Sequence, residues 1–211
     1  MRKVILSACL LCFCVGITAQ DGRPKKDRER KKMAEITSVI SISNMQRKGI
    51  HDALSRKREG TEALDSTLTA REAAFRKYAI DKECHEELVR QLSDRQIAEY
   101  CNAVFAPEVE AKTAYRMSLL TEVDNDYTEK ELAVARKEIY RYLMLEKIVY
   151  FKYKYDFARQ KENISRLKAI QPAALKSSLN NEKQKGYGKV MSGRVSWHHG
   201  NRNGHRGRNG R

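Results

Sequence analysis

The sequence predicts an all-α protein, and three observations lead to this fold class. Glycine and proline are scarce between residues 33 and 185, where they occur at four positions only, namely Gly49, Gly60, Pro107 and Pro172. The same stretch is rich in Ala, Leu, Glu, Lys, Arg and Gln, which favour helices. Three capping boxes, each a Ser or Thr followed three residues later by Glu or Gln, precede amphipathic segments. We expect an elongated helical bundle or hairpin of about four helices over residues 33–176, with one very long C-terminal helix.

The first two helices are expected over about 33–59 and about 70–91. The first carries Ile36, Val39, Ile40, Ile50 and Leu54 on its apolar side and is expected to end at Gly60. Its middle, "TSVISISN", is rich in Ser and Thr, which favour a helix less than the surrounding residues do. The second follows the capping box formed by Thr69 and Glu72.

The third and fourth helices also follow capping boxes, Ser93 with Gln96 and Thr128 with Glu131. The third is expected from Asp94 to about Leu120, with a kink or a new first turn at Pro107. The fourth is expected over about 129–170, before Pro172. At ~1.5 Å per residue it would reach roughly 60 Å. A helix of this length projects, bends or pairs with a second chain, so we expect a homodimer as one alternative.

The first twenty residues have the layout of a cleavable secretory signal. Arg2 and Lys3 precede an apolar run, and Ala19 lies just before the polar segment that follows. We expect cleavage near residues 19–20 and export to the periplasm or the medium. A retained membrane anchor and lipidation at Cys9 in "LSAC" are the alternatives, but the apolar run is shorter than the roughly 20 residues of a membrane span.

Removal of this signal would leave two cysteines, Cys84 and Cys101. An oxidising compartment permits a disulfide between them. Both lie in amphipathic segments, so buried free thiols are the alternative.

The net charge of +15 is concentrated at the two ends of the chain. Residues 21–32, which we expect to be a basic linker, carry +4, and residues 183–211 carry +8. Residues 33–182 carry only +1. A nearly neutral body does not have the charge of a phosphate-binding surface, and an exported protein seldom meets nucleic acid, so we do not expect nucleic acid as the partner.

Residues 177–211 are expected to form a Gly/Arg/Asn-rich basic tail that is disordered at least from residue 198. Tyr187, Val190, Val195 and Trp197 precede that point, so this part could pack on the body. The tail arginines are candidates for contact with an anionic polymer or lipid, namely Arg194, Arg202, Arg206, Arg208 and Arg211. Its histidines could hold a metal ion only weakly against this positive charge.

Enzymatic motifs are nearly absent from the sequence. The chain has no phosphate-binding Gly-rich loop, no HExxH and no nucleophile elbow. Cys84 and His85 are neighbours, but adjacent residues on a helix point about 100° apart and are poorly placed to share a proton. We therefore expect a protein that is not an enzyme and carries no cofactor.

An aromatic segment, "YFKYKYDF" at residues 150–157, alternates like a strand but lies within the predicted fourth helix. On a helix its aromatic side chains fall on two sides, as in the central member of a bundle. Tyrosine hydroxyls remain available to solvent or to a partner. We therefore propose a partner contact through five residues, namely Tyr150, Phe151, Tyr153, Tyr155 and Phe157.

The segment "LSDRQIAEYCNAVF" (92–105) resembles the LTxxQ motif of the Spy/CpxP family of bacterial periplasmic helical proteins. Leu92, Ser93 and Gln96 match the motif, with Ser in place of Thr, and "LTARE" (68–72) is a second near-match. The resemblance implies a small helical cradle, as a monomer or a dimer, that binds unfolded or stress-damaged envelope proteins without ATP, or that senses metal or envelope stress.

Together these features predict an exported, non-enzymatic helical protein that binds partner or client proteins in the bacterial envelope, in a chaperone-like manner. The alternative is a structural or surface-associated envelope protein whose basic tail contacts anionic polymer or lipid.

Overall fold

The computed structural model describes residues 25–64, 67–123, 126–175 and 179–193, and the secondary structure in these ranges is entirely helical. This confirms the predicted all-α class. The predicted signal sequence, the tail from residue 198 and the five tail arginines lie outside the described residues. The helices are α1 (Lys25–Val39), α2 (Asn44–Glu62), α3 (Ala70–Gln91), α4 (Asp94–Val123), α5 (Glu129–Lys152), α6 (Phe157–Leu175) and α7 (Asn181–Met191).

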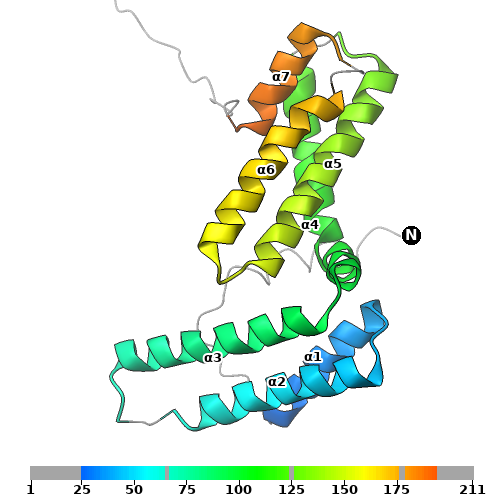
Figure 1. Cartoon of the computed structure of the whole chain (residues 1–211). Helices are drawn as coiled ribbons and strands as arrows, with labels where there is room; N and C mark the ends of the chain where they lie inside the picture. The colour runs from blue at the N-terminus through cyan, green and yellow to red at the C-terminus, as the bar shows by residue number, and fades with distance from the viewer. Residues whose placement is uncertain (1–24, 65–66, 124–125, 176–178, 194–211) are drawn as a thin grey trace, which may run out of the picture.

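The helices form two groups that share α4 (Figure 1). In one group α1, α2 and α3 lie together, with α2 and α3 as a hairpin. In the other, α5 packs against both α4 and α6, and α7 packs against α4. The first turns of α4 belong to the first group and its remaining length to the second, so α4 connects two separate apolar cores.

The first core lies among α1, α2, α3 and the beginning of α4. Its most buried members are Ile36, Ile50, Ile97 and Cys101, each with at most 1% of its surface exposed. The second core lies among α4, α5 and α7, with α6 along its edge. Each of these three helices contributes buried side chains, among them Val109, Leu119, Leu120, Ala135, Ile139, Leu143, Tyr187 and Val190.

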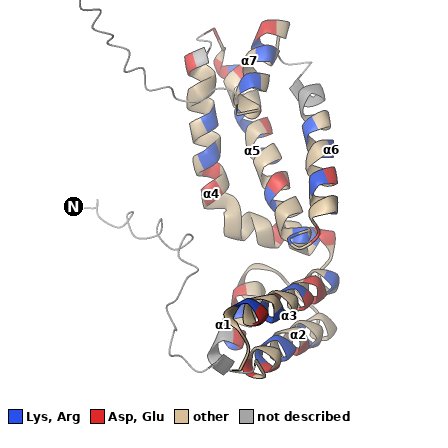
Figure 2. Cartoon of the chain, turned by 90° about the vertical axis from the view of Figure 1, so that its left-hand side faces the viewer, with Lys and Arg blue, Asp and Glu red and all other residues tan. Residues whose placement is uncertain are grey.

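Pro107 lies inside α4, between the residues that serve the two cores. Proline lacks a backbone N–H and its ring clashes with the carbonyl four residues earlier, which bends a helix. The path of α4 changes direction between its first turns and its main length (Figure 2). Of the two outcomes expected at this proline, the structure has the bend within one continuous helix.

The three predicted capping boxes are confirmed. The Thr69 and Thr128 hydroxyl oxygens accept hydrogen bonds from the backbone N–H of Glu72 and Glu131, respectively. In return, each glutamate carboxylate accepts the backbone N–H of its threonine. At α4, the Ser93 hydroxyl accepts the Gln96 N–H at 3.2 Å, and the Ser93 N–H donates to Gln96 Oε1 at 2.9 Å. These local signals place three of the helix starts correctly.

The helix predicted over 33–59 is two helices, and this part of the prediction is wrong. α1 begins at Lys25, within the segment 21–32 expected to be a linker, and ends at Val39. A fourth capping box, Ser43 with Gln46, starts α2. The Ser/Thr-rich middle of this segment is therefore a helix boundary, because its polar side chains satisfy the first free amides of α2.

The very long helix predicted over 129–170 is also two helices, antiparallel neighbours in the structure (Figure 1). α5 ends at Lys152, and Asp156 begins α6 by accepting the Arg159 N–H at 3.0 Å. The turn 153–156 contains neither glycine nor proline. The aromatic segment 150–157 is thus the end of one helix, a turn and the start of the next.

Residues 181–191, placed in the predicted tail, form α7. Tyr187 and Val190 are buried in the second core with 3% and 2% of their surfaces exposed. The expectation that this segment packs on the body is confirmed for Tyr187 and Val190, whereas Val195 and Trp197 lie outside the described residues. Among the described residues no helix is long and apolar enough to cross a membrane.

Candidate functional site

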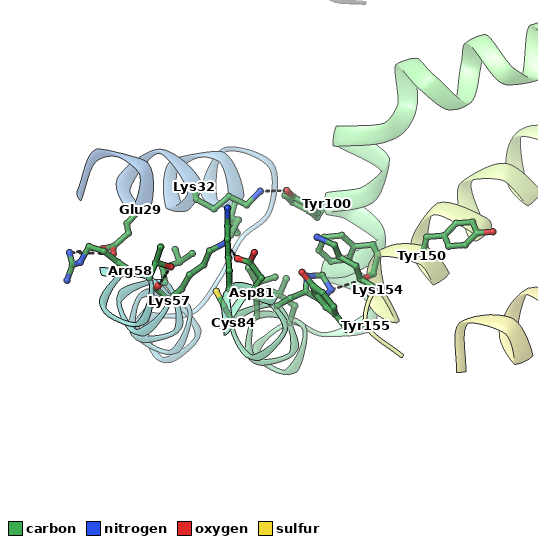
Figure 3. A pocket seen from close by; sticks show the side chains of 18 of the residues that line it. Glu29, Lys32, Lys57, Arg58, Asp81, Cys84, Tyr100, Tyr150, Lys154 and Tyr155 are labelled. Atoms are coloured by element: carbon green, nitrogen blue, oxygen red, sulfur yellow. Dashed lines mark hydrogen bonds and ion pairs between the residues drawn. The ribbon is translucent and has the colours of Figure 1, made fainter. Parts of the chain in front are cut away.

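A cleft of about 950 Å³ lies between the α1–α3 group and the α4–α5 corner (Figure 3). Residues of α1, α2, α3, α4, α5 and the turn after α5 line it. This volume is at the upper end of the range of roughly 300–1,000 Å³ that is usual for ligand sites. This cleft is our candidate functional site.

The floor of the cleft is apolar. Leu54, Leu88 and Leu92 reach it from α2, α3 and the end of α3, where each lies on the inward face of its helix. Phe105 of α4 lies at the meeting point of the two cores. A floor of this kind favours an apolar ligand, because every apolar group transferred onto it leaves water.

One wall of the cleft is a cluster of aromatic rings around His85 of α3. The His85 ring is edge-on to Phe151, with centroids 5.2 Å apart, and to Tyr155 at 5.5 Å. Tyr155 also meets Tyr78 of α3 at 5.2 Å, and Phe151 meets Tyr100 of α4 at 5.3 Å. Edge-to-face contacts of this kind add to the area buried by the rings. The turn after α5 is thereby fixed against α3.

His85 also forms a polar contact at the end of α5. Its Nε2 lies 2.7 Å from the Phe151 carbonyl oxygen, one of the carbonyls that have no partner within their own helix. A carbonyl can only accept, so Nε2 carries the hydrogen and donates it. Burial lowers the pKa of His85, and the Lys154 ammonium lowers it further, against the opposing effect of this hydrogen bond. His85 is therefore held as a neutral donor at neutral pH.

A three-membered polar network closes the α1 side of the cleft. The Lys32 ammonium donates to Glu35 Oε1 at 2.7 Å and to the Tyr100 hydroxyl at 2.9 Å, and that hydroxyl donates to the same carboxylate oxygen at 2.5 Å. Burial lowers the pKa of Lys32, but these hydrogen bonds outweigh it and the pKa is raised. Burial raises the pKa of Glu35, and the same bonds bring it below its usual value. Lys32 and Glu35 both stay charged, and α1 is tied to α4.

The rim of the cleft is rich in cations, several of them in ion pairs. Lys57 of α2 lies 2.6 Å from Asp81 of α3, and Arg58 lies 3.4 Å from Glu29 of α1. These two pairs join the three helices of the first group. Both Arg58 and Glu29 are largely buried, with 20% and 13% of their side chains exposed.

Three of the five aromatic residues predicted to contact a partner line the cleft: Tyr150, Phe151 and Tyr155. Tyr150 is 44% exposed and points away from α3 (Figure 3). Tyr153 lies outside the cleft, with the Lys152 ammonium 5.7 Å from its ring centre. Phe157 begins α6 with 69% of its surface exposed and is not part of the lining.

Cys84 and Cys101 are free thiols in the structure. Cys84 lines the cleft and is half-buried, whereas Cys101 is fully buried in the first core. Burial raises the pKa of Cys84 and raises that of Cys101 to about 12. Neither thiol is activated as a nucleophile. No group of three or more metal-ligating side chains occurs among the described residues.

Most of the lining was not foreseen from the sequence. Lys32, Arg58 and Tyr100 belong to different helices, and no spacing in the sequence relates them. The closest available signal was His85, a lone histidine on an amphipathic helix that carries no motif. The contact of His85 with Phe151 depends on the position of the end of α5 beside α3, which no sequence pattern indicates.

The motif-like segment that carries the family resemblance has a clear local role. Leu92 ends α3 and Ser93 caps α4, while the Gln96 amide nitrogen donates to the Ser41 carbonyl at 2.7 Å. Gln96 therefore joins the α1–α2 connection to the α3–α4 junction. The chain matches no protein-family model, no curated protein and no solved structure. The resemblance to the Spy/CpxP family stays a prediction.

Proposed function

We propose that this is an exported, non-enzymatic binding protein that holds an extended apolar segment of a partner or client protein in the cleft between its two helical groups. The observation that carries the proposal is the apolar floor of the roughly 950 Å³ cleft, bounded by the aromatic wall around His85. Apolar surface open to solvent beside polar residues is typical of a surface that takes up another molecule.

The composition of the lining supports a peptide as the ligand. Apolar side chains of a bound segment would displace water from the apolar surface of the lining, and each Å² of apolar surface that is covered contributes about 25 cal/mol. Ammonium and hydroxyl groups of the rim, such as those of Lys57 and Tyr155, are donors suited to backbone carbonyls. Aromatic residues with two rotatable bonds lose little entropy when they order around a ligand.

The proposal assigns binding and no chemistry to the cleft. Cys84 has a raised pKa and so little thiolate at neutral pH. The donor nitrogen of His85 is occupied by the Phe151 carbonyl. Export rests on the signal-like residues 1–20, and a chaperone-like role in the bacterial envelope rests on the resemblance of segment 92–105 to the Spy/CpxP family.

The alternative is a structural or envelope-attached protein that uses the basic tail, with Arg194, Arg202, Arg206, Arg208 and Arg211 on an anionic polymer or lipid. These residues lie outside the described part of the chain. The apolar lining of the cleft favours binding there, and tail attachment is the second proposal. A homodimer, proposed from the sequence, is compatible with either.

The test is suppression of aggregation of a chemically denatured client by the purified protein at ratios near one to one. The double variant Tyr150→Ser/Tyr155→Ser removes two aromatic residues from the lining and should lose most of the effect. Tyr115→Ser is the matched control, because Tyr115 is 50% exposed on α4 and is not part of the lining. Failure of the unaltered protein at every ratio, or equal activity of the double variant, would contradict the proposal.

A further inference from the structure

We infer that the segment held in the cleft is acidic as well as apolar, that is, a stretch of protein with Asp or Glu side chains next to hydrophobic ones. This inference rests on the proposed function and adds the class of partner. It starts from the charge balance of the lining. The lining has two carboxylates, Glu29 and Asp81, and six cationic side chains, namely Lys32, Lys57, Arg58, Lys77, Lys147 and Lys154.

Four of the six cations are neutralised within the protein. Lys57 and Arg58 pair with the two carboxylates of the lining, while Lys32 pairs with Glu35 and Lys147 with Glu108, each at 2.7 Å. The other two, Lys77 and Lys154, have no carboxylate partner in the described part of the chain. Both are exposed. They are the cations that an acidic ligand could pair with at no loss of an internal ion pair.

Lys77 and Lys154 lie on different elements next to apolar surface. Lys77 precedes Tyr78 on α3, and Lys154 lies in the turn after α5 with its ammonium 5.1 Å from the Tyr155 ring centre. Tyr78 and Tyr155 contact each other edge-on, so aromatic surface joins the two positions. A ligand with separated negative charges and apolar groups between them matches this arrangement of two lysines beside aromatic rings.

This distribution favours a polymer over a single lipid headgroup. The two lysines without a carboxylate partner among the described residues lie on different elements, Lys77 on α3 and Lys154 in the turn after α5. The paired cations Lys57 and Arg58 lie toward the other side of the cleft from Lys154 (Figure 3). One headgroup would need cations that converge on a point, whereas an acidic peptide presents charges along its length. The basic ends of this chain carry +4 over 21–32 and +8 over 183–211, the same sign of charge as the rim. The rim therefore repels them, and they are not suited to be the segment that the cleft holds.

The test uses three fluorescent peptides with the same apolar residues and with Glu, Gln or Lys at the same polar positions, and measures binding by anisotropy. We expect the Glu peptide to bind about tenfold more tightly than the Gln peptide, and the Lys peptide most weakly. Added salt should weaken binding of the Glu peptide and leave binding of the Gln peptide nearly unchanged. The variant Lys77→Glu/Lys154→Glu should reverse the order of the Glu and Lys peptides, and Lys77→Gln/Lys154→Gln should abolish the difference.

The matched control is Lys161→Glu/Lys168→Glu on α6, which makes the same charge change at exposed positions outside the cleft. It should keep the original order of the peptides. Equal binding of the Glu and Gln peptides would overturn the inference and leave the proposed function standing. Reversal by the α6 variant would also overturn it, because the effect would then belong to net charge alone. Failure of all three peptides would remove the proposed function, and binding of oleate in that case would assign the cleft to an acyl ligand.

Discussion

His85 donates a hydrogen bond to the carbonyl of Phe151 while its ring packs edge-on against the ring of the same residue. One side chain of α3 thus satisfies a free carbonyl at the end of α5 and covers the aromatic residue that carries it. This contact joins the two helical groups beside the cleft.

His85→Ala should therefore lower the free energy of unfolding by about 1–3 kcal/mol, because it leaves the Phe151 carbonyl without its donor and removes the ring contacts. Urea denaturation followed by circular dichroism measures this. His51→Ala is the control, since the His51 side chain is 63% exposed and should be replaceable without loss. An equal effect of the two substitutions would show that the contact with Phe151 contributes nothing.

The same contact predicts a loss of stability in mild acid. The pKa of His85 is lowered by burial, so it lies below the value of about 6.5 that the unfolded chain has. As the pH falls, the unfolded chain binds the proton first, and folding is opposed. The contribution of His85 to the free energy of unfolding should be complete above about pH 6.5. It should decrease as the pH falls from there toward the lowered pKa of the folded protein.

His85→Gln keeps an amide donor but has no titrating group, so its stability should change less over the same pH range. Denaturation curves at several pH values between 5 and 8 compare the two proteins. A decrease of the same size in His85→Gln would assign the acid sensitivity to other groups.

The two thiols should react at very different rates. Cys84 is half-buried in the cleft, whereas Cys101 has none of its surface exposed and its pKa is raised to about 12. We expect iodoacetamide to modify Cys84 first and Cys101 only after unfolding. Peptide mass mapping distinguishes the two positions. Modification of both at one rate in the folded protein would contradict the packing of the first core.

A bound peptide should protect Cys84 from this reagent, because the thiol faces the cleft that we propose to be occupied. A scrambled polar peptide that does not bind serves as the control. Unchanged reactivity of Cys84 at saturating peptide would place the bound segment elsewhere on the molecule.

Gln96 should contribute more to stability than other capping residues. It completes the α4 capping box and also donates to the Ser41 carbonyl, with Gln46 beside it at 3.2 Å. Gln96→Ala should cost about 1–2 kcal/mol. Glu72→Ala removes the equivalent member of the α3 box, whose hydrogen bonds within the described part of the chain go to the neighbouring Thr69, and should cost less. Thermal denaturation of the two variants tests the order.

The sequence predicted well those helix starts that depend on residues close to one another in the chain. The capping boxes at Thr69, Ser93 and Thr128 were read from four-residue patterns, and the structure has helices that begin there. Ser43 and Gln46 have the same pattern, but the apolar residues on both sides of them predict one continuous helix. That boundary was predictable from local chemistry.

Other boundaries depend on contacts between distant residues. The turn at 153–156 has no glycine or proline, and it is supported by His85 and Tyr78 of α3, which lie about seventy residues earlier in the sequence. Asp156 is the local signal for the start of α6, because aspartate is favoured at an N-cap, but no local signal marks the end of α5 before it. The cleft depends on this turn, and so its lining could not be assembled from sequence patterns.

α7 is the strongest case of tertiary contacts overriding local preference. Gly186 and Gly188 lie inside it, and each glycine costs a helix roughly 1 kcal/mol relative to alanine. Tyr187 and Val190 repay this by burial in the second core, and the Tyr127 hydroxyl donates to the Lys183 carbonyl at 2.9 Å. The composition of residues 181–191 is typical of a disordered tail, but these residues form α7 and complete the second core.

Tyr187→Ala should accordingly destabilise the protein by about 3 kcal/mol, as truncation of a buried aromatic residue does. Lys189→Ala is the matched control on the same helix, because Lys189 is exposed and the substitution changes no buried surface. Urea denaturation gives both values, and an apolar dye reports exposure of the second core. If Tyr187→Ala unfolds at the same urea concentration as Lys189→Ala and binds no more dye, then α7 does not complete the core, and residues 181–191 belong to the tail as the composition had indicated.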